Sequence, residues 1–167
     1  MAHPLVLGVF DSLAGAAHAA RAVHALGVSA RELSVVARDH EEEGELARAL
    51  DASPGVEIED SRLAGRLGEL GAYLVAAVAV GVPGLGPIVT AGPLSAELGE
   101  AAGHVAGGLG NILGGAGVSA AVVADWESRI RKGDILLAVH ATPTTSEAVR
   151  GAFEQSGAQA VTVAIWQ

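Results

Sequence analysis

The sequence predicts an α+β fold: a ferredoxin-like split β-α-β sandwich with a four-stranded antiparallel sheet, interrupted by a long Gly/Ala-rich helical hairpin. A β-α-β pattern occurs near each end of the chain, and the two copies align at one offset, so that Gly27 matches Gly157. A duplicated β-α-β pair is typical of the ferredoxin-like sandwich. Between the copies, residues 70–124 carry only two charged side chains, Glu97 and Glu100, which marks the middle of the chain as an insertion.

The first copy begins with residues 4–10, an apolar run of strand length. Asp11 and Ser12 are suited to cap the helix that follows, because their side-chain oxygens accept backbone N–H groups at a helix start. Gly27 is suited to end this helix, because glycine adopts the left-handed conformation required there. Residues 33–37 then provide the second strand, and the intervening helix is long enough for a crossover connection.

The second copy repeats this plan. Residues 134–140 and 160–166 are the expected strands. Thr144 and Glu147 stand at capping-box spacing before a helix that extends to about Gln155.

An acidic segment follows the first copy. Residues 39–50 predict a short exposed helix, with Asp39 and Glu42 at capping-box spacing. The acidic run from Asp39 to Glu45 either attracts a divalent cation or is a solvated helix start stabilised by the helix dipole, and the second interpretation is favoured.

The insertion predicts three helices. Residues 61–81 show a helical pattern, a second helix runs from about Ser95 towards Gly115, and Ser119 is suited to cap a third helix over 120–132. The chain is therefore expected to consist of residues 1–60, the insertion 61–132, and residues 133–167, which complete the first domain. The hairpin turn is assigned to Pro83, Gly84, Gly86, Pro87 and Pro93.

Glycines recur every four residues in the second of these helices. Such spacing places them on one helix face and allows another backbone to approach closely. The partner is either the helix over residues 63–80 of the same chain or the same helix of another copy. The expected packing residues are Gly99, Gly103, Gly107, Gly110 and Gly114, with Gly68 and Gly71 on the facing helix.

Composition excludes several functions. The formal net charge is −9 and the pI about 5.0, which argues against nucleic-acid binding because phosphates require clustered Lys and Arg. There is no Cys, which excludes disulfides and thiolate chemistry. The six His include no pair at i, i+4 spacing, and no nucleotide-binding glycine motif occurs in the required strand-helix context. We therefore expect no enzyme activity, no metal and no cofactor.

The expected location is the cytoplasm, because no basic segment precedes the first apolar run. The alternative is a hairpin embedded in the membrane, at the inner face of the cytoplasmic membrane. The length of the low-charge insertion favours this alternative, whereas the prolines in its first part argue against it.

The chain resembles the bacterial heat-induced general stress protein family (YflT-type). The likeness rests on Phe10-Asp11-Ser12, the strand LSVVA, the segment PGLGPIVTAGPL at residues 83–94, the Gly-rich helix and KGDILLAVHA at residues 132–141. It implies a ferredoxin-like domain interrupted by a Gly-rich segment and a link to stress. It implies no catalytic residue, because the family has no assigned activity.

Two function classes follow. The favoured one is a non-enzymatic, stress-associated structural protein that assembles with itself through its sheet and its glycine-rich hairpin. The alternative is a small-molecule or lipid sensor, or a membrane-anchored hairpin protein, with Asp11, Ser12 and His140 at the rim of a pocket.

Overall fold

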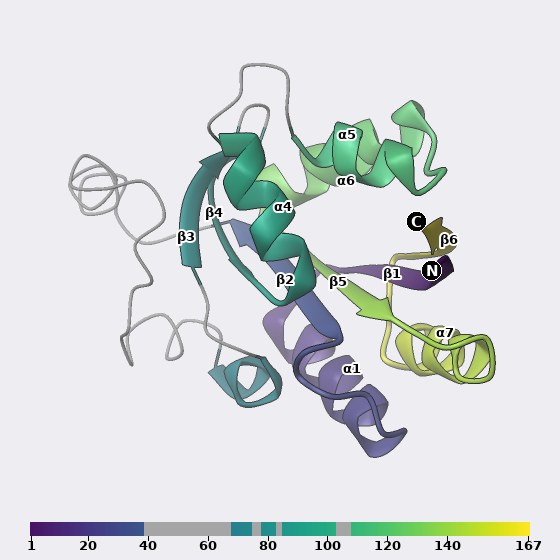
Figure 1. Cartoon of the computed structure of the whole chain (residues 1–167). Helices are drawn as coiled ribbons and strands as arrows, with labels where there is room; N and C mark the ends of the chain where they lie inside the picture. The colour runs from purple at the N-terminus through teal and green to yellow at the C-terminus, as the bar shows by residue number, and fades with distance from the viewer. Residues whose placement is uncertain (39–67, 75–77, 83–84, 103–107) are drawn as a thin grey trace.

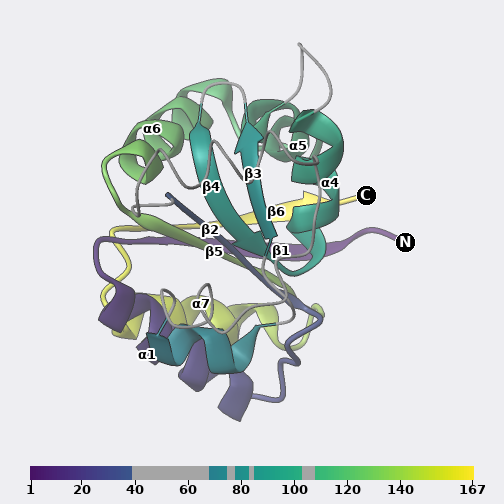
Figure 2. The ribbon, with the colours of Figure 1, turned by 90° about the vertical axis from the view of Figure 1, so that its left-hand side faces the viewer.

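A six-stranded antiparallel sheet with helices on both faces forms the protein (Figures 1 and 2). The computed structural model describes residues 1–38, 68–74, 78–82, 85–102 and 108–167. The strand order is β3-β4-β2-β5-β1-β6. The predicted α+β class is confirmed, whereas the prediction of a four-stranded sheet is wrong because β3 and β4 extend it.

The two ends of the chain supply four neighbouring strands and two helices. β5 lies between β1 and β2, and β6 pairs with the other side of β1. Their predicted positions are confirmed to within a few residues. These elements are β1 His3–Phe10, α1 Leu13–Ala25, β2 Leu33–Arg38, β5 Ile135–His140, α7 Ser146–Gln155 and β6 Ala160–Trp166.

The helix ends follow local signals with one exception. Ser12 caps α1 by accepting from the Gly15 amide at 3.0 Å, as predicted. At α7 the N-cap is Thr145, and the expected capping box of Thr144 and Glu147 is not formed. Instead, the Thr145 hydroxyl accepts from the Thr142 amide at 3.0 Å, which fixes the turn before the helix.

The insertion forms a β-hairpin where a helix was predicted. Within the described part of residues 61–81, η1 Gly68–Tyr73 is a short 3-10 helix and β3 Val78–Val82 is a strand. β3 pairs with β4 Gly86–Ala91, which in turn pairs with β2. The turn-rich segment was therefore located correctly but joins two strands rather than two helices. The alternating valines of VAVGV favour a strand because β-branched side chains fit a pleated sheet.

Three helices follow the hairpin: α4 Pro93–Ala102, α5 Leu109–Gly115 and α6 Ala120–Arg131. A single helix over 95–115 was expected, but α4 ends at Ala102 and α5 begins at Leu109. Ser119 caps α6, as predicted.

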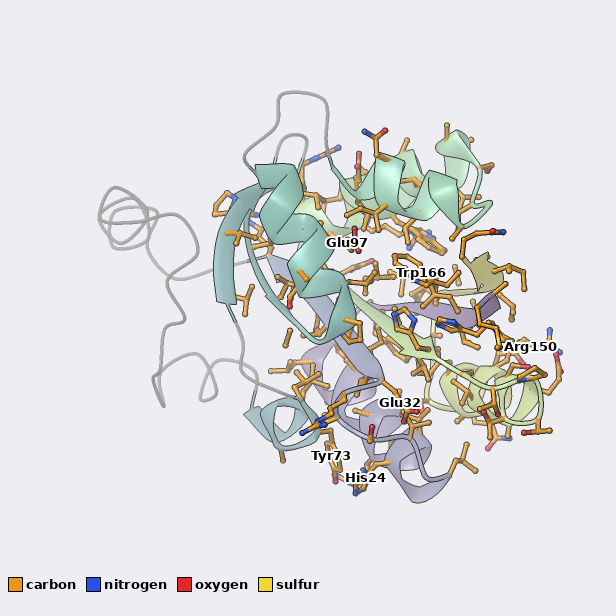
Figure 3. All side chains as sticks on the ribbon, viewed as in Figure 1. His24, Glu32, Tyr73, Glu97, Arg150 and Trp166 are labelled. Atoms are coloured by element: carbon orange, nitrogen blue, oxygen red, sulfur yellow. The ribbon has the colours of Figure 1, made fainter. Side chains whose placement is uncertain are left out.

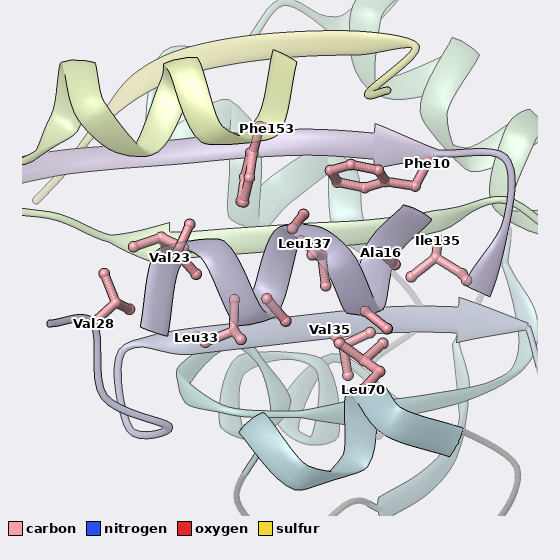
Figure 4. Close-up of a cluster of buried hydrophobic side chains, with 14 of the residues drawn as sticks. Phe10, Ala16, Val23, Val28, Leu33, Val35, Leu70, Ile135, Leu137 and Phe153 are labelled. Atoms are coloured by element: carbon pink, nitrogen blue, oxygen red, sulfur yellow. The ribbon is translucent and has the colours of Figure 1, made fainter. Parts of the chain in front are cut away.

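Two apolar cores lie on opposite faces of the sheet. Along β1, Val6 and Phe10 point to the face covered by α1, α7 and η1, and Phe10 meets Phe153 edge to face at 5.6 Å (Figure 4). Leu5, Leu7 and Val9 point to the face covered by α4, α5 and α6. This alternation is the two-residue period of a strand, and both faces are apolar because both are covered by helices.

Candidate functional site

An exposed strand edge lies at the β6 end of the sheet. β6 is the last strand in the order and pairs with β1 along its length. Alternate residues of an antiparallel strand direct both backbone polar groups to the same side. The Ile165 N–H donates to Ala116 O at 3.2 Å, outside the β1 ladder, so Ile165, Val163 and Val161 direct their backbone groups outward. The residue that ends α5, Ala116, therefore covers the edge at Ile165. We call the outer side of residues 160–166 the β6 edge.

The side chains of the β6 edge are uncharged, and all of them except Thr162 are apolar. Val163 is 42% exposed and Ile165 is 47% exposed. The segment AVTVAIW contains no charged residue, Pro or Gly. Natural edge strands are usually protected from pairing with other chains by charge, proline, bulges or short length. The seven-residue β6 carries no charge and no proline. It is therefore suited to pair with another strand around Val163, although Ala116 covers it at Ile165.

A histidine pair lies beside this edge. The His3 Nε2 and His140 Nδ1 atoms are 2.7 Å apart, at the start of β1 and the end of β5. The Trp166 ring meets the His140 ring edge to face at 5.2 Å, and Trp166 is the register partner of His3. Figure 3 shows Trp166 between α5 and the strand β1. The three rings thus close one end of β1, β5 and β6.

The hydrogen bonds determine the tautomers of this pair. His3 Nδ1 lies 3.2 Å from Met1 O, and a carbonyl only accepts, so His3 Nδ1 carries the proton. In neutral His3 the Nε2 atom therefore accepts from His140 Nδ1, which leaves a lone pair on His140 Nε2. This buried Nε2 atom has no hydrogen-bond partner among the described residues.

The surroundings of His140 favour its neutral form. Burial lowers the pKa of the His140 imidazole, the neighbouring His3 lowers it further, and the Glu32 carboxylate opposes both effects. Desolvation disfavours the charged form of an imidazole, which is the dominant cause here.

The predicted ligand rim is not assembled by the fold. Asp11 and Ser12 follow Phe10, which pairs with Ile135, whereas His140 pairs with Leu5 at the other end of β1 and β5. The length of β1 therefore separates Asp11 and Ser12 from His140. The three residues do not form the pocket rim that the sensor hypothesis requires.

The predicted glycine packing is also not seen among the described residues. η1, which contains Gly68 and Gly71, packs against α1, on the opposite face of the sheet from α4. A methyl group added at Gly99 or Gly114 would meet nothing within 4 Å. At Gly110 it would meet only Val123 Cγ1, at 4.0 Å. Gly103 and Gly107 lie outside the described residues, as does the acidic run from Asp39 to Glu45.

The segment at residues 83–94 has a structural role where it is described. Gly92 has φ +85°, and a side chain there would collide with the backbone of Leu33 and Ser34. The Ser34 hydroxyl accepts from the Leu94 amide at 3.0 Å, and the Thr90 hydroxyl donates to Val35 O at 2.8 Å. These contacts fix the turn from β4 to α4 against β2. Gly86 and Pro87 begin β4 and Pro93 begins α4, whereas Pro83 and Gly84 lie outside the described residues.

A second polar pair was not predicted from the sequence. His18 Nδ1 and Ser156 Oγ lie 2.9 Å apart and join α1 to the end of α7. Among the described residues, no group of three or more His, Asp and Glu is placed to hold a metal ion. Within that same part of the chain, no helix has the length and apolar character needed to cross a bilayer.

Comparison with known proteins gave no match among family models, curated proteins or solved structures.

Proposed function

We propose that this chain is a non-enzymatic structural protein whose copies associate by pairing their β6 edges. The observation that carries the proposal is the uncharged edge strand with Val163 and Ile165 exposed. A link to stress, suggested by the motif at residues 83–94, belongs to the same proposal. A ferredoxin-like core is supported by the neighbouring order β2-β5-β1-β6 and by α1 and α7 lying on one face.

The strand is complementary to itself in an antiparallel, two-fold arrangement. With the axis at Val163, which directs its backbone outward, Val163 faces its own copy. Val161 lies towards Ile165 of the partner copy, but the Ile165 N–H stays bonded to Ala116 O of its own chain, so the backbone pairing is centred on Val163. All of these side chains lie on the α7 face of the sheet, because Val163 is opposite Val6 in the β1 ladder. Pairing would therefore cover the exposed valine and isoleucine, and cross-strand pairs of β-branched residues stabilise a sheet.

Charge favours this edge for contact between two copies. Each copy has a formal net charge of −9, so two copies repel each other, and an uncharged contact surface adds no further repulsion between like charges at short range. The nearby helix α7 carries Arg150 between two acids, 3.2 Å from Glu147 and 3.8 Å from Glu154. Figure 3 shows Arg150 on the outside of α7. Arg150 offsets one of the two neighbouring acidic charges, so these three side chains together carry a net charge of −1.

Contact through the glycines of the insertion is not part of the proposal. The expected ladder from Gly99 to Gly114 is divided between α4 and α5, so the described residues offer no continuous helix face for it.

The test is the molar mass in solution, measured by sedimentation equilibrium over a range of concentrations. The wild-type chain should form a dimer. Val163→Lys should be monomeric, with association weakened at least about tenfold, because two like charges would meet at the axis. Leu26→Lys is the matched control: Leu26 is 43% exposed at the end of α1, away from the edge, and its variant should still dimerise.

A charge-swap experiment tests the register. Val163→Glu alone should also be monomeric. An equimolar mixture of Val163→Lys and Val163→Glu should form a heterodimer, because opposite charges would then face each other across the axis. A monomeric wild type at about 100 μM, far above a typical specific dissociation constant, would overturn the proposal. A Val163→Lys variant that dimerises as well as wild type would overturn the assignment to β6.

A further inference from the structure

We propose that the turn between α5 and α6 restrains self-association, because it occupies the Ile165 end of the β6 edge and competes there with a second copy. We call residues 116–118 the guard turn. The inference rests on the proposed function, since it concerns the same edge. It is carried by the bond from the Ile165 N–H to Ala116 O, at 3.2 Å, and by the buried side chains that hold the turn in place.

The guard turn closes the end of α5 in a conformation that requires glycine. Gly117 has φ +89°. Its N–H donates to Gly114 O at 3.0 Å, and the Val118 N–H donates to Leu113 O at 3.0 Å. Helices that end in this way usually bring the two apolar side chains on either side of the glycine together. Leu113 and Val118 are both buried in the core covered by α4, α5 and α6, so the turn is anchored on its inner side.

The guard turn covers one end of the β6 edge and leaves the rest open. Figure 1 shows the turn from α5 to α6 beside the end of β6. The buried Ala116 accepts from the Ile165 N–H through its carbonyl. Val163 and Val161 also direct their N–H groups outward, but the described part of the chain offers these two groups no hydrogen-bond partner. A second copy therefore finds free donors only on the Val161 side of Ile165.

The guard turn and the partner copy compete for the same N–H group. With the axis at Val163, Val161 of the partner copy lies opposite Ile165. Opposite residues of this kind in an antiparallel ladder exchange two N–H···O bonds, and one of the two requires the Ile165 N–H. This single donor cannot serve both Ala116 O and the Val161 carbonyl of the partner copy. Pairing is therefore confined to Val163 while the turn is closed and extends to Ile165 when the turn opens.

Gly117→Ala loosens the turn without a collision, because an added methyl group would meet nothing within 4 Å. Alanine disfavours the left-handed conformation by about fivefold in an equilibrium constant, which corresponds to about 1 kcal/mol.

Gly27→Ala is the matched control. Gly27 has φ +94° and equally free surroundings. It closes α1 by the same two bonds, from its own N–H to His24 O at 2.9 Å and from the Val28 N–H to Val23 O at 3.1 Å. The core beneath this turn lies on the other face of the sheet, so its opening leaves the β6 edge unchanged.

The first measurement is amide hydrogen exchange by NMR in the monomeric Val163→Lys background. Ile165 and Val161 are both β-branched and both follow an alanine, so their unprotected amides should exchange at similar rates. The Ile165 amide should exchange much more slowly than the Val161 amide, because the guard turn protects it. Adding Gly117→Ala should accelerate exchange at Ile165 by about fivefold, since exchange passes through the open turn. Adding Gly27→Ala should not. Equal exchange at Ile165 and Val161 would overturn the inference.

The second measurement is the dimer dissociation constant of chains that retain Val163, by sedimentation equilibrium. Gly117→Ala should lower this constant at least about twofold, up to a limit of about fivefold for each copy, because a change that favours the open turn also favours the longer pairing. Val118→Ala should act in the same direction, since it loosens the anchor from the buried side and adds no atom near the edge. Gly27→Ala should leave the constant unchanged.

The outcomes separate the inference from the proposed function. Faster exchange at Ile165 without tighter association in either Gly117→Ala or Val118→Ala would overturn the competition, while the proposed function stands. A wild type that is monomeric at about 100 μM would overturn the proposed function, even if slow exchange at Ile165 supports the cover that the guard turn provides.

Discussion

Two glycines, Gly86 and Gly92, lie at the two ends of β4, where the β3–β4 hairpin joins the rest of the sheet. Gly92 combines a positive φ of 85° with close contact to β2, where an added Cβ would lie 2.7 Å from the Ser34 Cα atom. Gly86 also has a positive φ, 76°, but a Cβ there would meet nothing within 4 Å. Comparing Gly86 with Gly92 therefore separates the energetic cost of the backbone conformation from the cost of a steric collision.

Gly92→Ala should destabilise the fold much more than Gly86→Ala. We expect a loss of about 1 kcal/mol for Gly86→Ala, the cost of the left-handed conformation. For Gly92→Ala we expect about 3 kcal/mol or more, because a collision with backbone is added to that cost. Urea denaturation followed by circular dichroism measures both. Equal losses of unfolding free energy in the two variants would show that the close contact of Gly92 with β2 does not contribute to stability.

The histidine pair shows what the sequence does not reveal at this scale. His3 and His140 each stand at a strand end, but they meet only because Leu5 is opposite His140 and His3 is opposite Trp166. A shift of one residue in register would place either ring on the other face. Periodicity predicts a strand and its two faces, but it does not fix register between segments 137 residues apart.

At the scale of elements, the sequence predicts the ends of the chain well and the middle poorly. Helix α1 begins at its Ser12 cap, and the helices of residues 1–38 and 133–167 end at the glycines Gly27 and Gly157. Residues 78–82 are a short apolar run, which periodicity alone does not assign to helix or strand. The deciding influence is tertiary: β2 has one side free after pairing with β5, and β4 pairs with that side.

Two glycines, Gly151 in α7 and Gly8 in β1 beneath it, have opposite expected effects on stability. Gly151, inside α7, has nothing within 4 Å of an added methyl group, so Gly151→Ala should stabilise the fold by about 0.5–1 kcal/mol through helix propensity. Gly8 lies on β1 below the helix, where a methyl group would come within 2.6 Å of the buried Phe153 ring. Gly8→Ala should therefore cost about 1–3 kcal/mol. Thermal unfolding of both variants checks the pair, and a stabilising Gly8→Ala would show that Phe153 has room to move.

At the scale of the whole molecule, small side chains allow three layers to pack in a short chain. The buried face of α1 consists mainly of alanines, among them Ala16 and Ala20, while large side chains such as Trp126 lie under α6 on the other face. The four-residue spacing of the glycines predicts close pairing of two helices. In the described structure the alanines of α1 instead bring this helix close to the sheet. Composition alone does not distinguish a helix packed on a helix from a helix packed on a sheet.

Charge at this scale predicts how salt acts on self-association. Two copies with a formal net charge of −9 each repel, and added salt screens that repulsion, with a screening length of about 10 Å at 0.1 M. The β6 edge contributes no charged residue, so salt has no ion pair to weaken along the paired strands. The dimer should therefore tighten between about 0.05 M and 0.5 M NaCl, by roughly threefold to tenfold, when sedimentation equilibrium is repeated at neutral pH. Arg150→Gln, which removes the positive charge from α7, should increase this dependence on salt. Association that weakens as salt is added would mean that the copies meet through ion pairs and not through β6.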